Sequence, residues 1–278
     1  MLSATFKYFL KSKAGIVGLA ILTVILILAA FAHYIAPYDP IEQQFTQQLQ
    51  PPSLTHFLGT DRYGRDIFSR IVYGTRYALL SGLLADGVAL GIGCLLGLIA
   101  AFYGGWWDFL IMRGVDVMMA FPYLLLAMLT IAILGPGLIN AMIAIGIVYA
   151  PQYARILRSS VLSIKETDYI TAARAMGAND PRIMFQHILP NAMAPIIVQA
   201  TLTAGAAIIE AAGLGFLGLG AQPPTPEWGA MLSGGRDFML SAPWIATFPG
   251  LAIAITVLGF NLLGDAMRDA LDPTLHRH

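Results

Sequence analysis

Charged residues are scarce in this 278-residue chain. Asp, Glu, Lys and Arg make up 12% of it, while 57% is hydrophobic and the mean hydropathy is +0.70. That charged fraction is about half of what an average soluble domain carries, so the composition excludes an ordinary soluble domain and indicates an integral membrane protein. The formal net charge is zero, which argues against the clustered basic surface that nucleic acid requires. The few charges therefore mark segments that leave the lipid.

Residues that would supply chemistry are scarce as well. The single cysteine, Cys94, excludes an intrachain disulfide and lies in an apolar run typical of a packed core thiol. No lysine follows glycine, so the chain lacks the phosphate-binding loop by which many proteins hold ATP. Histidines are too scattered for a metal site, and no hydrolytic triad can be assembled. We expect no catalytic residue and no metal ligand. The lysines are Lys7, Lys11, Lys13 and Lys165, and the histidines are His33, His56, His187, His276 and His278.

Long apolar runs are abundant. A span needs about 20 apolar residues to cross ~30 Å of hydrocarbon, and it must be helical because lipid offers no partner for open backbone groups. The first run resembles a secretory signal but exceeds the usual signal core of roughly 7 to 15 residues, so we interpret it as a spanning helix. Six transmembrane helices are predicted, near residues 14–35, 77–102, 110–134, 137–154, 192–213 and 244–267.

Six crossings place both ends of the chain on one side. With a cytoplasmic amino terminus, eleven Lys and Arg residues lie inside and five outside, as the positive-inside rule favours. The predicted organisation is a cytoplasmic segment (1–13), a single transmembrane domain (14–273) and a tail (274–278). Within the domain we expect an external amphipathic segment (37–76), a cytoplasmic loop (155–190) and an external loop (213–243).

The external segment 37–76 opens with prolines that are incompatible with a continuous helix. Its end, residues 67–76, has apolar residues at helical spacing beside charged ones, which predicts a helix lying at the membrane surface. It is either a plain cover over the bundle or a contact for an external partner.

Glycines recur within the second predicted span, and small residues four apart let helix backbones approach closely. We expect Gly87, Gly91, Gly93 and Gly97 to pack helices.

The external loop 213–243 begins with a Gly-rich turn and continues with three prolines and Trp228. It is interpreted as a re-entrant gate, a docking rim or a rigid structural loop, and Trp228 is assigned to no ligand.

The loop 155–190 carries the clearest local pattern. Thr167 or Asp168 can cap a first helix through a side-chain oxygen, and Gly177 ends it. Asn179 or Asp180 can cap a second helix that has Pro181 at its first position. Two helices joined by a sharp bend are therefore predicted.

Small residues in the first of these helices, Ala172, Ala173 and Ala175, form a shallow face that could enter a groove on another protein; the alternative is a plain loop. The run Thr171-Ala172-Ala173, then Gly177, then His187-Ile188-Leu189-Pro190 resembles the EAA loop of ABC importer permeases, E-A-A-x3-G-x9-I-x-L-P. Thr171 replaces the glutamate, and His187 replaces the isoleucine.

Four further blocks carry the same resemblance in the same order. They are LGTDRYGRDIFSR from Leu58, RGVDVMMAFP from Arg113, GFLGLGAQPPTPEWGAML from Gly215 and FNLLGDAMRDALDP from Phe260. Together they resemble the C-type permease subunit of the dipeptide, oligopeptide, glutathione and nickel importers of the bacterial inner membrane.

The resemblance implies a non-catalytic subunit that forms half of a pathway for small peptides, or for nickel or another small solute. It implies a second homologous permease, two ATPase subunits that bind ATP and Mg²⁺, and an extracytoplasmic solute-binding protein. The family's loop helix docks into a cleft on the ATPase. The implied coupling residues are Tyr169, Thr171, Ala172, Ala173, Arg174, Gly177, Asp180 and Pro181.

Two acids within predicted spans support a rival class, an ion-coupled secondary transporter. A charged carboxylate at a helix centre costs at least ~2.5 kcal/mol, so Asp86 and Glu210 are expected to line a pathway, contact a subunit or be satisfied structurally. A membrane scaffold without transport is a third class.

Overall fold

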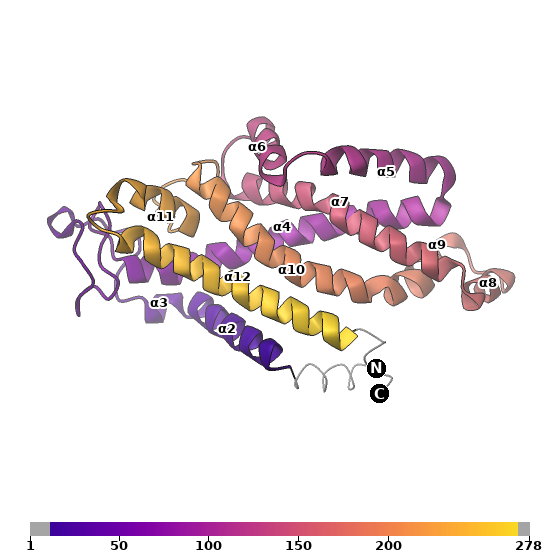
Figure 1. Ribbon diagram of the computed structural model, residues 1–278, viewed down its shortest axis with the longest axis horizontal. Helices are drawn as coiled ribbons and strands as arrows, with labels where there is room; N and C mark the ends of the chain where they lie inside the picture. The colour runs from indigo at the N-terminus through magenta and orange to yellow at the C-terminus, as the bar shows by residue number, and fades with distance from the viewer. Residues whose placement is uncertain (1–11, 272–278) are drawn as a thin grey trace.

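The computed structural model describes residues 12–271, and nearly all of their regular structure is helical. The long helical segments form an elongated bundle (Figure 1). They are α2 (Lys13–Ala30), α4 (Ile67–Tyr103), the pair α5 (Gly105–Met119) and α6 (Tyr123–Leu134), α7 (Leu138–Lys165), α10 (Leu189–Phe216) and α12 (Trp244–Leu271). The predicted all-α membrane class is confirmed.

Short helices occupy the connections. They are α3 (Ala32–Ile35), η1 (Phe45–Gln47), α8 (Asp168–Ala175), α9 (Asp180–Arg182), the π-helix η2 (Ile183–Ile188), α11 (Trp228–Gly235) and η3 (Arg236–Phe238). In Figure 1, α8 lies at one end of the molecule, and α11 lies at the other. The predicted segment 1–13, apart from Ser12 and Lys13, and the predicted tail 274–278 lie outside the described residues.

All six predicted spans fall on helices. Among the described residues, four helical stretches are long and apolar enough to cross a membrane, namely α2, α4, residues 180–216 and α12, and the bent pair α5–α6 raises the count to five. The central helix α7 is not among them, and its second half carries Arg155, Arg158 and Lys165. The helices are therefore compatible with the six predicted crossings.

The third predicted span, residues 110–134, is corrected by the structure. It is two helices, α5 and α6, bent by 102° at residues 120–122. Pro122 has no amide proton to donate, and it disfavours helical backbone at Phe121, so the helix breaks despite its apolar composition.

The surface helix predicted at residues 67–76 is also corrected. These residues are the first turns of α4, which runs without a break from Ile67 to Tyr103. Asp66 caps this helix by accepting a hydrogen bond from the Ser69 amide at 2.8 Å. Ile67, Arg70 and Val72 are buried, because α11 and its flanking loops cover this end of α4.

Glycines bring α4 and α7 into close contact at two of the four predicted positions. A Cβ atom placed on Gly93 would lie 2.3 Å from the carbonyl oxygen of Ala150, and one on Gly97 would lie 2.3 Å from that of Ala154. Nothing lies within 4 Å of a Cβ built on Gly87 or Gly91. The prediction is therefore right for Gly93 and Gly97 and wrong, within the described chain, for Gly87 and Gly91.

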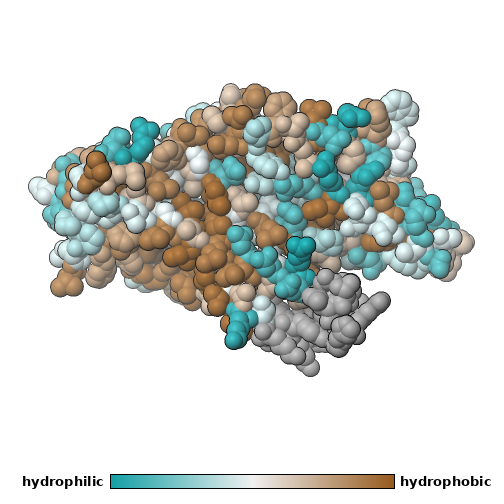
Figure 2. All heavy atoms as spheres, viewed as in Figure 1, coloured by the Kyte–Doolittle hydropathy of each residue, from teal (hydrophilic) through white to brown (hydrophobic). Residues whose placement is uncertain are grey.

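The outer surface has the character of a membrane protein. Figure 2 shows hydrophobic residues gathered over the middle of the molecule and hydrophilic residues gathered around the end that carries α8. Large apolar side chains are exposed along the long helices, including Val24 on α2, Leu129 on α6 and Leu258 on α12. Lipid is the environment in which such exposure is favourable.

Candidate coupling surface and membrane-buried polar groups

The two-helix turn predicted after α7 is present. α8 ends at a bend where Gly177 has φ +85°, a left-handed conformation that favours glycine. The amide of Ala178 donates to the carbonyl oxygen of Ala173 at 3.1 Å and closes the end of the helix. Thr167 occupies the N-cap position, but its hydroxyl donates to the Ile164 carbonyl oxygen instead of capping α8. The prediction of a side-chain cap there is therefore wrong.

The second helix begins at Asn179, whose side-chain oxygen accepts from the amide of Arg182 at 3.1 Å. Asn179 is thus the cap, and Asp180 and Pro181 stand in the first turn. The helix then opens into the π-helix η2 before α10, and the Leu189 amide donates to the carbonyl oxygen of Met184. Pro190 lacks an amide proton, which favours this wider spacing.

The exposure of α8 divides the predicted coupling residues into two groups. Ala173 is the buried member, at 4% exposed, and it holds the helix against the bundle together with Ile170, which is 1% exposed and was not among the predicted residues. Ala173 therefore packs inside this chain, and Ala172 is the exposed alanine of the motif. The other exposed members are Tyr169, Thr171, Arg174, Gly177, Asp180 and Pro181.

Sequence reasoning missed an apolar residue at this surface. Met176 is 82% exposed, directly before the bend. It lies outside the conserved letters of the motif, so the only available signal was a large apolar residue in a polar loop.

The two-helix turn contacts the ends of two long helices that lie beside it. The Arg174 guanidinium lies over the ring of Phe102, on α4, at 5.6 Å, and the Lys165 ammonium donates to the carbonyl oxygen of Ala101 at 3.0 Å. On the other side, the side-chain amide of Asn191, on α10, donates to the Tyr169 hydroxyl at 3.3 Å. α8 is therefore in contact with both α4 and α10.

Ion pairs hold α5 against α7. Arg158 binds both carboxylate oxygens of Asp108, at 2.5 and 2.6 Å. Arg155 donates to Asp116 at 2.7 Å. Arg155 and Arg158, which the predicted topology puts on the cytoplasmic side, thus pair with acids of a neighbouring helix.

The two acids singled out within predicted spans differ in their surroundings. Asp86 is buried on α4 and accepts a hydrogen bond from the Tyr153 hydroxyl of α7. Glu210 is half-buried on α10, and its carboxylate has no hydrogen bond or ion pair among residues 12–271. No hydrogen bond joins the two acids within that range.

Polar residues near Asp86 form a ladder that the sequence did not reveal. The side-chain amide of Gln152 donates to the Tyr123 hydroxyl at 2.6 Å. The amide of Gln199 donates to Gln152 Oε1 at 3.1 Å and to Thr203 Oγ1 at 2.9 Å. The ladder joins α6, α7 and α10.

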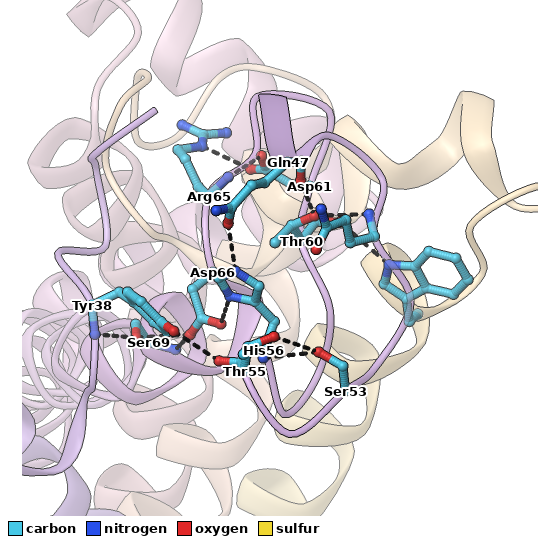
Figure 3. Close-up of polar contacts among 12 residues, drawn as sticks. Tyr38, Gln47, Ser53, Thr55, His56, Thr60, Asp61, Arg65, Asp66 and Ser69 are labelled. Carbon is cyan, nitrogen blue, oxygen red and sulfur yellow. Dashed lines mark hydrogen bonds and ion pairs between the residues drawn. The ribbon is translucent and has the colours of Figure 1, made fainter. Parts of the chain in front are cut away.

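At the start of α4, the block beginning at Leu58 and the segment before it form a compact network of polar contacts (Figure 3). Asp66 accepts from His56 Nδ1 at 2.9 Å and from Ser69, while Arg65 binds Asp61 at 2.7 Å. These buried pairs give the block a structural role, because they fix the loop from which α4 begins. His56 is used here, and residues 12–271 contain no group of three potential ligands that could hold a metal ion.

The external loop is packed tightly. Trp228 is 2% exposed and its indole donates to the Ile71 carbonyl oxygen at 3.2 Å. Glu227 caps α11 by accepting from the amides of Gly229 and Ala230, both at 2.8 Å. Burial raises the pKa of the Glu227 carboxyl above its usual range, although these two amides oppose the shift.

A helical bundle with an apolar outer surface and an exposed two-helix turn at one end is the architecture of a transport permease. The family model "Binding-protein-dependent transport system inner membrane component" matches residues 93–277, and "N-terminal TM domain of oligopeptide transport permease C" matches residues 1–52. The chain belongs to the family of binding-protein-dependent transport system inner membrane components.

Similar proteins span nearly the whole chain. A dipeptide transport system permease protein of Alkalihalophilus pseudofirmus is 54% identical over 270 residues, 97% of this chain and 89% of that protein. A di/tripeptide transport system permease protein of Pseudomonas aeruginosa is 50% identical over 273 residues, 96% and 90% of the two chains. A glutathione transport system permease protein of Pectobacterium atrosepticum is 47% identical over 270 residues, 97% and 90%.

A solved structure shares the fold. The inward-facing MetNI methionine ABC transporter matches with a TM-score of 0.60 and 22% identity, over 73% of this chain and 96% of that one. Together with the family models, these likenesses identify a non-catalytic permease subunit of an ABC importer. The ion-coupled and scaffold alternatives are therefore wrong.

Proposed function

We propose that this chain forms half of the translocation pathway of an importer for small peptides and that α8 couples the pathway to ATP hydrolysis. A second homologous permease forms the other half, two ATPase subunits bind ATP and Mg²⁺, and an extracytoplasmic solute-binding protein delivers the peptide. The chain lies in a bacterial inner membrane with both ends in the cytoplasm, and residues 14–273 form one permease domain.

The exposed apolar surface of the coupling turn carries this proposal. Met176 and Tyr169 are 82% and 43% exposed, and Ala172 lies exposed on the helix between them. Large apolar side chains on a turn outside the predicted spans favour a protein partner, because burial of such a side chain contributes about 1.5–3 kcal/mol. Ile170 and Ala173 pack against the bundle and fix the position of α8, so the exposed face of this helix has a fixed shape.

The fastening of α8 supports a mechanical role. ATPase closure displaces α8, and the contacts through Phe102 and Asn191 carry that displacement to α4 and α10. The bundle then tilts against the second permease, and the pathway opens alternately to the two sides of the membrane.

The choice of solute rests on the relatives, which are named for dipeptide, di/tripeptide and glutathione transport. A nickel or other small-solute importer of the same family is the alternative. Uptake of a radiolabelled dipeptide, compared with uptake of nickel, by the assembled transporter with its binding protein distinguishes the two.

Binding of purified ATPase subunits tests the coupling surface. Ala172→Glu inserts a charge where we expect close contact, and an unpaired buried charge costs about 3–5 kcal/mol, so affinity should fall more than roughly a hundredfold. Ala14→Glu makes the same change at an exposed position in the first turn of α2 and should bind as the wild type does. Equal binding by all three proteins would refute the proposed contact.

A further inference from the structure

The polar ladder of Tyr123, Gln152, Gln199 and Thr203 has hydrogen-bonding capacity that the described chain does not use. Within residues 12–271, the Tyr123 hydroxyl accepts from Gln152 but donates to nothing, and Gln199 Oε1 accepts nothing. No buried side-chain nitrogen or oxygen in that range lacks a partner. Gln199 Oε1, which has no partner, is therefore not fully buried, and the Tyr123 hydroxyl keeps a proton that no residue in that range accepts.

Glu210 continues the ladder along α10. It stands 11 residues beyond Gln199 (210 − 199), which is close to three helical turns, so both side chains lie on one face about 16 Å apart along the axis. Thr203, four residues after Gln199, shares that face. One side of α10 thus carries an amide, a hydroxyl and an acid within a helix that is otherwise largely apolar.

Lipid cannot cover this face favourably. An amide or hydroxyl group without a partner is unfavourable in an apolar medium, and polar residues within spanning helices face the bundle interior or water. Ile197, on the same helix, is an exposed apolar residue suited to lipid. Thr203 is buried within the bundle at 2% exposed, whereas Gln199 and Glu210 are half-buried, so the exposed parts of these two side chains face water or another protein.

We propose that this ladder is a subsite of the pathway that binds the main-chain amide of a peptide in transit, and that Glu210 attracts its terminal ammonium group nearer the outer end. The inference rests on the proposed function. A peptide group presents one N–H donor and one C=O acceptor, which match the open acceptor of Gln199 and the open donor of Tyr123. Recognition of these groups is independent of the peptide's side chains.

Glu210 and the polar ladder bind a short peptide one after the other. Extended chain spans at most about 3.3–3.6 Å per residue, so a dipeptide covers roughly 7 Å and cannot reach both Gln199 and Glu210, which lie about 16 Å apart by helix rise. The ammonium group meets Glu210 first, and the amide reaches Gln199 deeper in the membrane.

Substituted-cysteine labelling tests the subsite, because Cys94 is the only native cysteine. In the assembled transporter, reconstituted with its partners, Cys94→Ala provides the background for Gln199→Cys and for the control Ile197→Cys. A charged, membrane-impermeant methanethiosulfonate reagent needs a water-exposed thiolate. We expect Gln199→Cys to react at least about tenfold faster than Ile197→Cys, and a dipeptide trapped during turnover to slow that reaction.

The outcomes separate this inference from the function on which it rests. ATP-driven dipeptide uptake by the Cys94→Ala transporter reports the proposed function. If that uptake is intact, equal labelling at Gln199→Cys and Ile197→Cys overturns the subsite, and so does labelling that dipeptide leaves unchanged. Loss of the second permease from the Gln199→Cys complex also overturns it, because the ladder would then be a subunit contact.

Discussion

The close contact of α4 and α7 leads to a prediction with an internal control. Gly93→Ala places a methyl group 2.3 Å from the Ala150 carbonyl oxygen and 2.5 Å from the Tyr153 Cβ. Both neighbours are rigid, so the helices must separate. Gly91→Ala, half a turn away on the same helix, places its methyl group in open space.

The difference in stability between Gly93→Ala and Gly91→Ala measures the cost of disturbing the close contact between α4 and α7. Both exchange glycine for alanine in a helix and share the same gain of about 1 kcal/mol in intrinsic propensity. Overpacking costs about 1–3 kcal/mol, so Gly93→Ala should be less stable than Gly91→Ala by that amount. At roughly 2–4 °C per kcal/mol for a chain of this size, their melting temperatures should differ by about 2–12 °C.

Thermal unfolding of the purified chain in mild detergent, followed by circular dichroism, measures this difference. The order of the two melting temperatures is the critical result. Equal melting temperatures, or a more stable Gly93→Ala, would refute the account of how α4 packs on α7.

One further prediction compares two turns at opposite ends of the molecule, and another concerns the buried Glu227. Gly177→Ala and Gly218→Ala each put a side chain on left-handed backbone, φ +85° and +76°, in open space, so each should lower the stability of the fold by about 1–2 kcal/mol. Only Gly177→Ala should also lower ATP-driven uptake. Equal losses of uptake in the two variants would contradict the role of the bend. Burial raises the pKa of the Glu227 carboxyl in the folded state, so protonation of this carboxyl favours folding. The melting temperature of the wild type, measured relative to that of Glu227→Gln, should therefore rise as the pH falls from above the raised pKa toward the usual value of 4.5. A difference that stays constant with pH would count against the burial effect.

Local features of the chain could be predicted because they depend on neighbouring residues. The bend after α8 follows from Gly177 and from a cap at the start of the next helix. The helices themselves follow from long apolar runs in lipid.

Features that depend on pairing between distant segments could not be predicted. The four glycines of α4 look alike in sequence, and only the position of α7 decides that Gly93 is packed and Gly91 is free. The same holds for Ala172 and Ala173, whose exposure depends on which side of α8 meets the bundle. Gln152 and Gln199 are 47 residues apart and come together only when α7 and α10 pack.

ATP-driven uptake of a labelled dipeptide into proteoliposomes that contain the complete transporter tests the central claim most directly. The account predicts that Ala172→Glu abolishes uptake while the chain still assembles with the second permease, and that Ala14→Glu transports normally. Uptake by Ala172→Glu at the wild-type rate, with ATP hydrolysis still coupled to it, would contradict the account.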